Sequence, residues 1–192
     1  MVCEQAEVLR ALGRRRPGQY YHHVCHFLSS DCIVNDMQVE RYRDAVATNR
    51  RKHGFETIEA ERSGFERVWR AREEDPTVGT VSLFATVVDA STYDTDDIVD
   101  IADRFRAVID RRTDGRDDSV TLIGYVVFVV PDPDPELVSA ATSYVVANRR
   151  SAVFPLVYDT ETETLHTHPI PRLKGRGIYK RQVEDAERLF EL

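Results

Sequence analysis

The pattern of apolar and polar positions is clearest in Ser119–Pro131, SVTLIGYVVFVVP, the longest apolar run of the chain. Acidic residues precede this run, and a segment rich in Pro and Asp follows it. A membrane-spanning helix needs about 20 apolar residues, so the run is too short to cross a bilayer. A valine-rich run between turn residues predicts a strand that is buried on both faces, in the middle of a sheet covered by helices.

Four segments carry apolar residues at helical spacing. They are Val39–Arg51, Tyr93–Arg112, Pro135 to about Asn148, and Tyr179–Phe190. Asp94 or Thr95 can cap the second helix, and Asp134 can cap the third, in which Pro135 takes the first helical position. Gly54 is a plausible stop for the first helix.

Strand patterns fill the segments between these helices. Phe55–Ala60 and Phe65–Arg72 alternate charged and apolar residues, which predicts a hairpin with one exposed face and a turn at Arg62–Gly64. More apolar strands are expected at Thr80–Val88, Ser119–Pro131 and Ala152–Tyr158, with a short one at Leu165–His168. Strands that alternate with helices predict right-handed crossovers. The sequence therefore predicts one α/β domain, with a mixed five- to six-stranded sheet and helices on its faces.

The first 36 residues differ in composition from residues 37–192, which we expect to form the domain. They hold all three cysteines and three of the six histidines: Cys3, Cys25, Cys32, His22, His23 and His26. One hypothesis is a zinc site built from Cys25, Cys32 and these histidines, although the paired spacing of zinc motifs is missing. The other hypotheses are an extension, ordered or not, and a translation start at Met37. We expect no structural disulfide, because cytosolic thiols stay reduced.

The composition indicates in which cellular environment the protein works and which kinds of partner are disfavoured. The chain has 33 acidic residues against 26 basic ones, and a net charge of −7. Only three of the basic residues are lysines, and this combination of many acids, many arginines and few lysines resembles proteins of salt-loving archaea. The net charge disfavours a general nucleic-acid-binding protein. No signal-peptide pattern or membrane-spanning run is present, so we expect a cytoplasmic protein.

The stretch Pro171–Arg181, PRLKGRGIYKR, concentrates positive charge around glycines at the start of the last helix. The candidate anion-binding residues are Arg172, Lys174, Gly175, Arg176, Gly177, Lys180 and Arg181. Backbone N–H groups and cations at a helix N-terminus can bind an anion such as a phosphate. The motif of a P-loop is missing, and the alternative is a basic connection that pairs with acids or faces solvent.

Three apolar strands are followed by an aspartate: Asp89, Asp132 and Asp159. If these strands are parallel, the three carboxylates share one edge of the sheet and can hold Mg²⁺ or Mn²⁺. The alternative is that they serve as turn and cap residues. His166 and His168 lie two positions apart on a predicted strand, and we expect them to form an exposed pair.

The order helix, three strands, helix, strand over Gln38–Val130 resembles the core of the PD-(D/E)xK nucleases, the restriction-endonuclease-like family. In that family, an acid on the second core strand and an acid-x-Lys motif on the third bind Mg²⁺ and activate water. Here the third strand, Ser82–Val88, has no acid or lysine, and the second offers only Glu66. The resemblance therefore implies a member of the family that does not cleave nucleic acid. The segment Val153–His168 also looks like proteins of salt-loving archaea.

These observations favour a non-catalytic binding or regulatory protein without a cofactor, working with a protein partner. The first alternative is a divalent-metal-dependent nuclease or phosphoesterase that uses the three aspartates with Mg²⁺ or Mn²⁺. The second is a nucleic-acid-binding protein that uses Arg62, Arg67, Arg70 and the C-terminal basic loop. That alternative requires these groups to lie on one continuous face of the protein.

Overall fold

The computed structural model describes residues 30–58, 64–76, 79–112, 120–147, 151–172 and 176–192, and only the backbone of residues 30–36, Val146 and Arg176. The chain divides into two units, Met1–Val34 and Asn35–Leu192, and the α/β fold lies in the second unit. The proposed zinc ligands and the predicted turn residues Arg62 and Ser63 lie outside the described side chains. Those expectations stay predictions.

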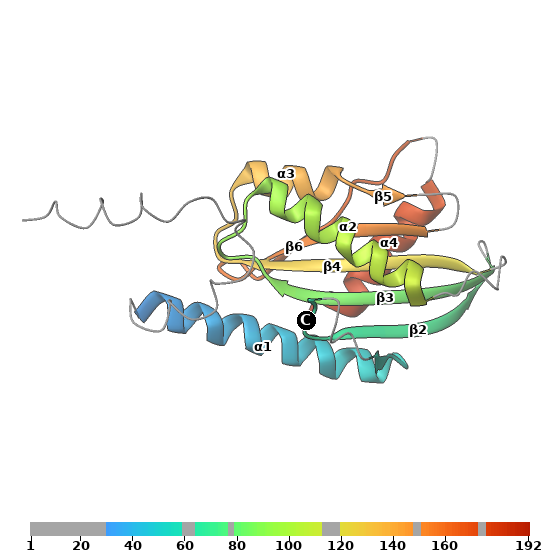
Figure 1. The fold of residues 1–192 in the computed structure, drawn as a ribbon, viewed down its shortest axis with the longest axis horizontal. Coiled ribbons are helices and arrows are strands. Elements are labelled where there is room, and N and C mark those ends of the chain that lie inside the picture. The colour runs from blue at the N-terminus through green and yellow to red at the C-terminus, as the bar shows by residue number, and fades with distance from the viewer. Residues whose placement is uncertain (1–29, 59–63, 77–78, 113–119, 148–150, 173–175) are drawn as a thin grey trace, which may run out of the picture. The chain divides into compact units, whose positions relative to one another are not determined.

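Within the described residues, seven strands form one mixed sheet (Figure 1). They are β1 (Glu56–Ile58), β2 (Val68–Asp75), β3 (Gly79–Asp89), β4 (Thr121–Val130), β5 (Val146–Ala147), β6 (Ser151–Asp159) and β7 (Thr164–His166). Six strands follow the order β1-β2-β3-β4-β6-β5, and β7 also pairs with β6. β3, β4 and β6 are mutually parallel, whereas the other pairings are antiparallel. The predicted mixed α/β sheet is confirmed.

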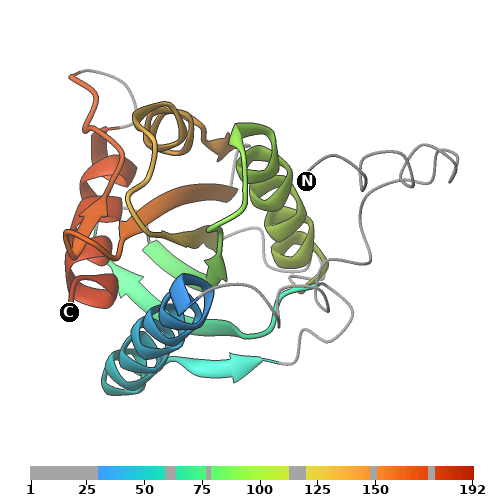
Figure 2. The ribbon, with the colours of Figure 1, turned by 90° about the vertical axis from the view of Figure 1, so that its left-hand side faces the viewer.

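Four helices of the described chain cover the two faces of this sheet (Figure 2). They are α1 (Ser30–Lys52), α2 (Thr95–Arg112), α3 (Pro135–Ser143) and α4 (Arg176–Phe190). Apolar side chains of α1 and α4 pack with the odd-numbered positions of β3 and β4. Those of α2 and α3 pack with the even-numbered positions of β4 on the other face. The sheet is thus the middle layer of three.

The central strand β4 has the position that its sequence predicts. Every residue from Ile123 to Val130 is buried, with parallel neighbours on both sides and helices on both faces. Gly124 lies at the contact with α2, where an added Cβ atom would come within 2.5 Å of Cδ1 of Ile109 and 3.0 Å of Cγ2 of Val153. The missing side chain therefore lets α2 approach the strand closely.

Capping residues set several helix ends. The Oδ1 atom of Asp94 accepts the N–H groups of Asp96 and Asp97 at 2.9 and 3.0 Å, so Asp94 is the N-cap of α2. The carboxylate of Asp97 accepts the N–H of Asp94 in return, as in a capping box. Asp134 caps α3 in a similar way. Gly54, with a φ of 72°, follows α1 as predicted.

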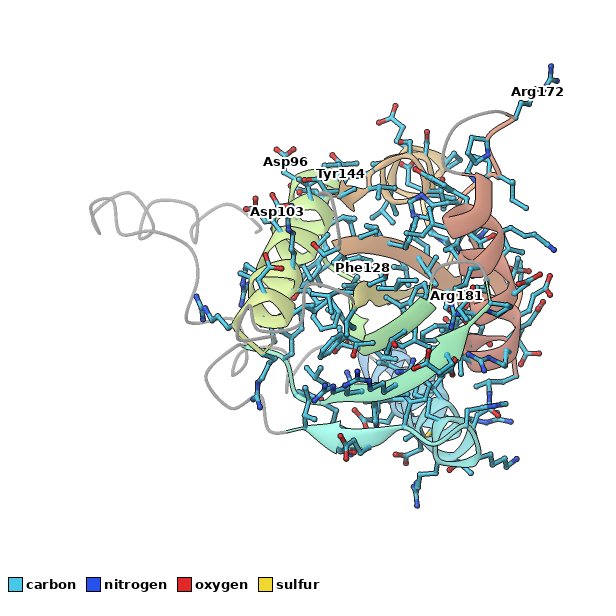
Figure 3. The ribbon with its side chains drawn as sticks, turned by 90° about the vertical axis from the view of Figure 1, so that its right-hand side faces the viewer. Asp96, Asp103, Phe128, Tyr144, Arg172 and Arg181 are labelled. Atoms are coloured by element: carbon cyan, nitrogen blue, oxygen red, sulfur yellow. The ribbon has the colours of Figure 1, made fainter. Side chains whose placement is uncertain are left out.

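α3 is shorter than predicted, and the prediction that it reaches Asn148 is wrong. The helix ends at Ser143, Tyr144 has an extended backbone, and Val146–Ala147 pair with β6. The β-branched valines favour a strand at this point, and the pairing covers part of the edge of β6. Tyr144 is half-buried, and its hydroxyl donates to Asp103 of α2 at 3.1 Å (Figure 3).

β2 and α1 also differ from their predicted ranges. Acidic residues Glu73–Asp75 follow the predicted end of this strand at Arg72, but they stay in β2 and pair with Val81–Gly79. Arg181 of α4 neutralises Glu73 and Asp75, which the local sequence does not show. α1 begins at Ser30 rather than at Val39. No described helix is both long and apolar enough to span a membrane.

A proline interrupts the outer edge of β6. Pro155 has no N–H group, and the edge pairs with β5 only as far as Val153 and with β7 only from Val157. The carbonyl of Pro155 accepts a hydrogen bond from Nε2 of His168 at 2.7 Å. The ring of His168 packs edge-on against Phe154. The side chain of His168 therefore binds the backbone of β6 at a position that neither β5 nor β7 pairs with.

Candidate functional site

Opposite charges join α4 to β2 on the face of the sheet that α1 and α4 cover. We call this group the α4–β2 cluster, and its members are Glu73, Asp75, Arg181, Asp185 and Arg188. The guanidinium of Arg181 donates to Glu73 at 2.7 Å, to Asp185 at 3.2 Å and to Asp75 (Figure 3). Arg188 donates to Glu73 at 3.0 Å and to Asp185 at 2.8 Å. Each carboxylate of the cluster is thus bound by an arginine of α4.

The cluster extends into the core through β4. The hydroxyl of Tyr125 donates to Oδ2 of Asp185 at 2.8 Å, and both residues are buried. Burial, and then the adjacent carboxylate, raises the pKa of Tyr125 well above its ordinary value. Burial opposes the protonated form of Arg181, but Asp185, Asp75 and Glu73 outweigh it and raise the pKa. Arg181 therefore keeps its charge next to the core.

A cavity of about 130 Å³ adjoins the cluster. Its walls come from the end of β2, the start of β4 and the first half of α4, and they comprise Asp75, Thr121, Ile123, Gly177, Ile178, Lys180, Arg181 and Glu184. A cavity of about 150 Å³ accommodates benzene, so this one has room for about six non-hydrogen atoms. Its lining combines charged groups of both signs with two isoleucines, which suits a small polar molecule.

The structure brings only part of the predicted anion-binding set to this cavity. Gly177, Lys180 and Arg181 line it, but Arg181 is already bound by three carboxylates. Lys180 lies 3.3 Å from Glu184 in an exposed ion pair. Arg172 is exposed and extends away from the body of the domain (Figure 3). Lys174, Gly175 and the side chain of Arg176 lie outside the described residues.

The predicted metal-site aspartates lie at one edge of the sheet, and the carboxylates of Asp89 and Asp159 bind backbone N–H groups there. β3, β4 and β6 are parallel, so Asp89 and Asp159 end the two strands that flank β4, at the same edge of the sheet. The Oδ1 atom of Asp159 accepts the N–H groups of Glu161 at 2.8 Å and of Asp132 at 3.3 Å. Asp89 accepts the N–H of Ser91 at 3.0 Å. These contacts are those of turn residues.

The hydrogen bonds to Asp159 also set its ionisation. Burial opposes the charged form, but the hydroxyl of Thr162 and three backbone N–H groups together hold its pKa below the ordinary value. Among the described residues, no group of three or more His, Cys, Asp or Glu side chains is arranged to hold a metal ion. The Mg²⁺ or Mn²⁺ site stays a prediction that these contacts do not favour.

The predicted exposed histidine pair is wrong for His168. β7 ends at His166, which is half-buried, whereas His168 is 1 % exposed. Burial lowers the pKa of His168 to about 4, although the hydrogen bond to Pro155 opposes this shift. Because a carbonyl only accepts hydrogen bonds, the neutral imidazole carries its proton on Nε2.

The arginines of the nucleic-acid hypothesis are divided between the two faces of the sheet. Arg67 is 3.3 Å from Asp44 on α1. Arg70 lies over the ring of Phe84, which belongs to the core on the α2 and α3 face. Arg62 lies outside the described residues. Arg67 and Arg70 therefore do not form the continuous basic face that this hypothesis requires.

Arg50 is a buried cation in the last turn of α1. Its side chain is 0 % exposed, and its guanidinium carbon lies 4.3 Å from the ring centre of Phe190 and 4.4 Å from that of Trp69. None of its side-chain nitrogens has a hydrogen-bond partner among the described residues. Burial lowers the pKa of Arg50 to about 9. The aromatic faces are thus its main electrostatic contacts.

The sequence did not indicate that Glu73 and Asp75 of β2 would belong to the α4–β2 cluster. Glu73 and Asp75 precede a Pro in a stretch typical of a loop, and their partners are more than 100 positions away. Arg181 and Asp185 at i,i+4 on a predicted helix were a visible signal of an ion pair. Nothing local indicated that this pair would be buried against Tyr125.

No model of a known protein family matches the chain, and a search of curated proteins finds no similar sequence. The resemblance of Gln38–Val130 to the PD-(D/E)xK nucleases therefore stays an expectation. β3 carries no acid or lysine between Val81 and Val88, so the acid-x-Lys motif of that family has no counterpart in this part of the strand. The function has to be argued from the site.

Proposed function

We propose that this chain is a non-catalytic binding protein that holds a small polar molecule in the cavity between α4, β2 and β4. The observation that carries the proposal is the cavity itself, with about 130 Å³ of space and a lining that combines charged and apolar groups. Small-molecule sites are concave and present a few fixed polar groups in this way. The described contacts assemble no nucleophile with a base, so a binding role explains the site with the fewest assumptions.

The α4–β2 cluster supports this proposal because it makes the cavity wall rigid. Arg181 is held by three carboxylates and is only 12 % exposed. A fixed wall reduces the entropy that a ligand must overcome on binding. Helix α4 also carries Gly177, Ile178, Lys180 and Glu184 into the lining. A bound molecule would therefore fasten α4 to the sheet.

The wider setting of the proposal comes from the sequence. We propose a cytosol of high salt, as the acidic and arginine-rich composition favours, and a protein partner near the cavity. Ile170 is 44 % exposed and Arg172 is exposed, which makes this segment a suitable contact for such a partner.

Thermal unfolding with and without ligand tests the proposal. Wild type, Thr121→Phe and Thr57→Phe are compared in the presence of amino acids, organic acids, amines and inorganic phosphate, each added separately. Thr121→Phe fills the cavity from β4, and Thr57→Phe places the same ring on an exposed position of β1 as a control. A ligand at about 100 times its Kd adds about 2.7 kcal/mol to the free energy of unfolding.

We expect at least one class of compound to raise the Tm of wild type and of Thr57→Phe but not that of Thr121→Phe. The proposal fails if no compound does so. Adding Mn²⁺ in the same assay tests the metal-dependent alternative. A shift in wild type that Asp159→Asn abolishes would favour that alternative.

A further inference from the structure

We propose that the cavity binds a small zwitterion of about six non-hydrogen atoms, with one ammonium and one carboxylate group. This inference rests on the proposed function, because it names the class of ligand that the same cavity holds. Alanine has this size and both groups, so it is the simplest probe.

The lining presents both signs of charge within a small volume. Asp75 and Glu184 supply carboxylates, whereas Lys180 and Arg181 supply cations. A purely anionic ligand would face two carboxylates, and a purely cationic ligand would face two positive groups. Like charges repel, which disfavours both of these ligands. A zwitterion is the ligand that can place each of its groups next to the opposite sign.

The ligand carboxylate fits the start of α4. The first N–H groups of a helix have no partner within the helix and favour negative charge, and Gly177 and Ile178 belong to this turn. Lys180 is next to them, and its ion pair with Glu184 is exposed on both sides, at 66 % and 60 %. Such exposed pairs contribute little stability, so Lys180 can turn to a ligand at little cost.

The ligand ammonium fits the carboxylates of the lining. Within the described residues, the α4–β2 cluster has three carboxylates against two guanidiniums, and Asp75 belongs to both the cluster and the cavity. Glu184 supplies a second carboxylate in the lining. These two carboxylates are therefore the groups that a ligand ammonium would approach.

The remaining lining limits the size of the ligand. Ile123 and Ile178 offer apolar surface for a methyl group, and Thr121 offers a hydroxyl between the charged walls. An added Cβ atom at Gly177 would meet no atom within 4 Å, so the helix leaves space at this point. A short side chain fits here.

Two-dimensional ¹H–¹⁵N NMR of the full chain tests the inference. The protein is titrated separately with alanine, lactate, alaninol and inorganic phosphate. Lactate replaces the ammonium group of alanine by a hydroxyl, and alaninol replaces the carboxylate. We expect alanine to shift the amide signals of Thr121 and Gly177 to saturation, and lactate and alaninol to bind about tenfold more weakly or less.

Substitutions on the exposed side of α4 locate the binding without disturbing the core. Glu184→Gln and Lys180→Gln should each weaken alanine binding about tenfold, which corresponds to about 1.4 kcal/mol. Glu187→Gln is the matched control, because Glu187 is an exposed acid of the same helix that does not line the cavity. An equal effect of Glu184→Gln and Glu187→Gln would contradict the assignment.

The outcomes separate the two proposals. Binding of lactate, alaninol or phosphate at least as tight as that of alanine overturns the zwitterion but leaves the proposed function standing. If none of the four probes gives a saturable shift, the zwitterion is overturned. The thermal comparison of Thr121→Phe with Thr57→Phe then decides whether the cavity binds another class of molecule.

Discussion

Arg50 and His168 are both buried polar side chains, but their surroundings satisfy them differently. His168 is neutral and uses one ring nitrogen to bind the carbonyl of Pro155. Arg50 is surrounded by aromatic rings and has no hydrogen-bond partner among the described residues. Replacing His168 should therefore change how the stability depends on pH, whereas replacing Arg50 should change the stability itself.

Protonation of His168 should destabilise the fold as the pH falls. The pKa of this group is about 4 in the fold and 6.5 in an unfolded chain, so between these values the unfolded state binds more protons. The stability is fully present above pH 6.5 and is lost as the pH falls through about 4. The shift corresponds to about 3 kcal/mol at most. Urea unfolding, followed by the fluorescence of Trp69, measures this slope.

His168→Gln keeps a donor for the Pro155 carbonyl but does not titrate. We expect it to reduce the slope of the stability against pH between pH 6.5 and 4. Equal slopes in wild type and His168→Gln would mean that other groups cause the loss of stability.

Arg50→Met should raise the free energy of unfolding by about 1–3 kcal/mol, since replacing a buried charge by an apolar side chain of similar volume is often stabilising. The sulfur and methylene groups of Met can fill the space between Trp69 and Phe190. Arg43→Met is the control, because Arg43 is also buried but pairs with Glu66 at 2.8 Å. Urea unfolding of both variants is the measurement. A loss of stability in Arg50→Met would show that the cation–π contacts outweigh the cost of burial.

At the scale of elements, the fold depends on how closely helices approach the sheet. α2 contacts β4 at Gly124, where side-chain atoms fill the space that a Cβ atom would need. α4 contacts the sheet through apolar side chains and, in addition, through the charged α4–β2 cluster and the hydroxyl of Tyr125. α4 therefore adds ion pairs to its apolar packing, whereas the contact of α2 at Gly124 depends on steric fit.

Gly124→Ala should lower the free energy of unfolding by about 1–3 kcal/mol, because Ile109, Val153 and Phe105 would have to move. Gly177→Ala is the control, since its Cβ atom meets nothing and alanine favours the helix by about 0.8–1.0 kcal/mol. Chemical unfolding of the two variants should give shifts of opposite sign. Stabilisation by both would show that α2 adjusts to the added methyl group.

At the scale of the whole molecule, negative charge is in excess. The net charge of −7 destabilises a compact chain by self-repulsion, and salt screens this repulsion. The Debye length falls from about 10 Å at 0.1 M salt to about 3 Å at 1 M. Buried members of the α4–β2 cluster are screened much less.

Molar KCl should therefore stabilise the protein. We expect a gain of about 1 kcal/mol between 0.1 M and 1 M KCl, which raises the Tm by about 2–4 °C in a chain of this size. Differential scanning calorimetry at both salt concentrations measures the change. A fall in Tm would mean that screened ion pairs contribute more than surface repulsion, and it would weaken the proposal of a high-salt cytosol.

The sequence by itself determined the elements whose signals are local. The valine-rich run gave β4, the cap at Asp94 gave the start of α2, and Asp134 with Pro135 gave the start of α3. It also determined the fold class, because apolar strands alternate with amphipathic helices. Each of these features depends on residues within a few positions of one another, so periodicity and capping chemistry suffice.

Only the tertiary structure decided which charges meet and which polar groups are buried. Glu73 and Asp75 look like loop acids until α4 brings Arg181 across more than 100 positions of sequence. His168 looks like a surface residue until Pro155 leaves a carbonyl at the edge of β6. Pairing with β6 likewise overrode the helical pattern beyond Ser143. Such long-range contacts determine burial, and burial determines what a polar side chain does.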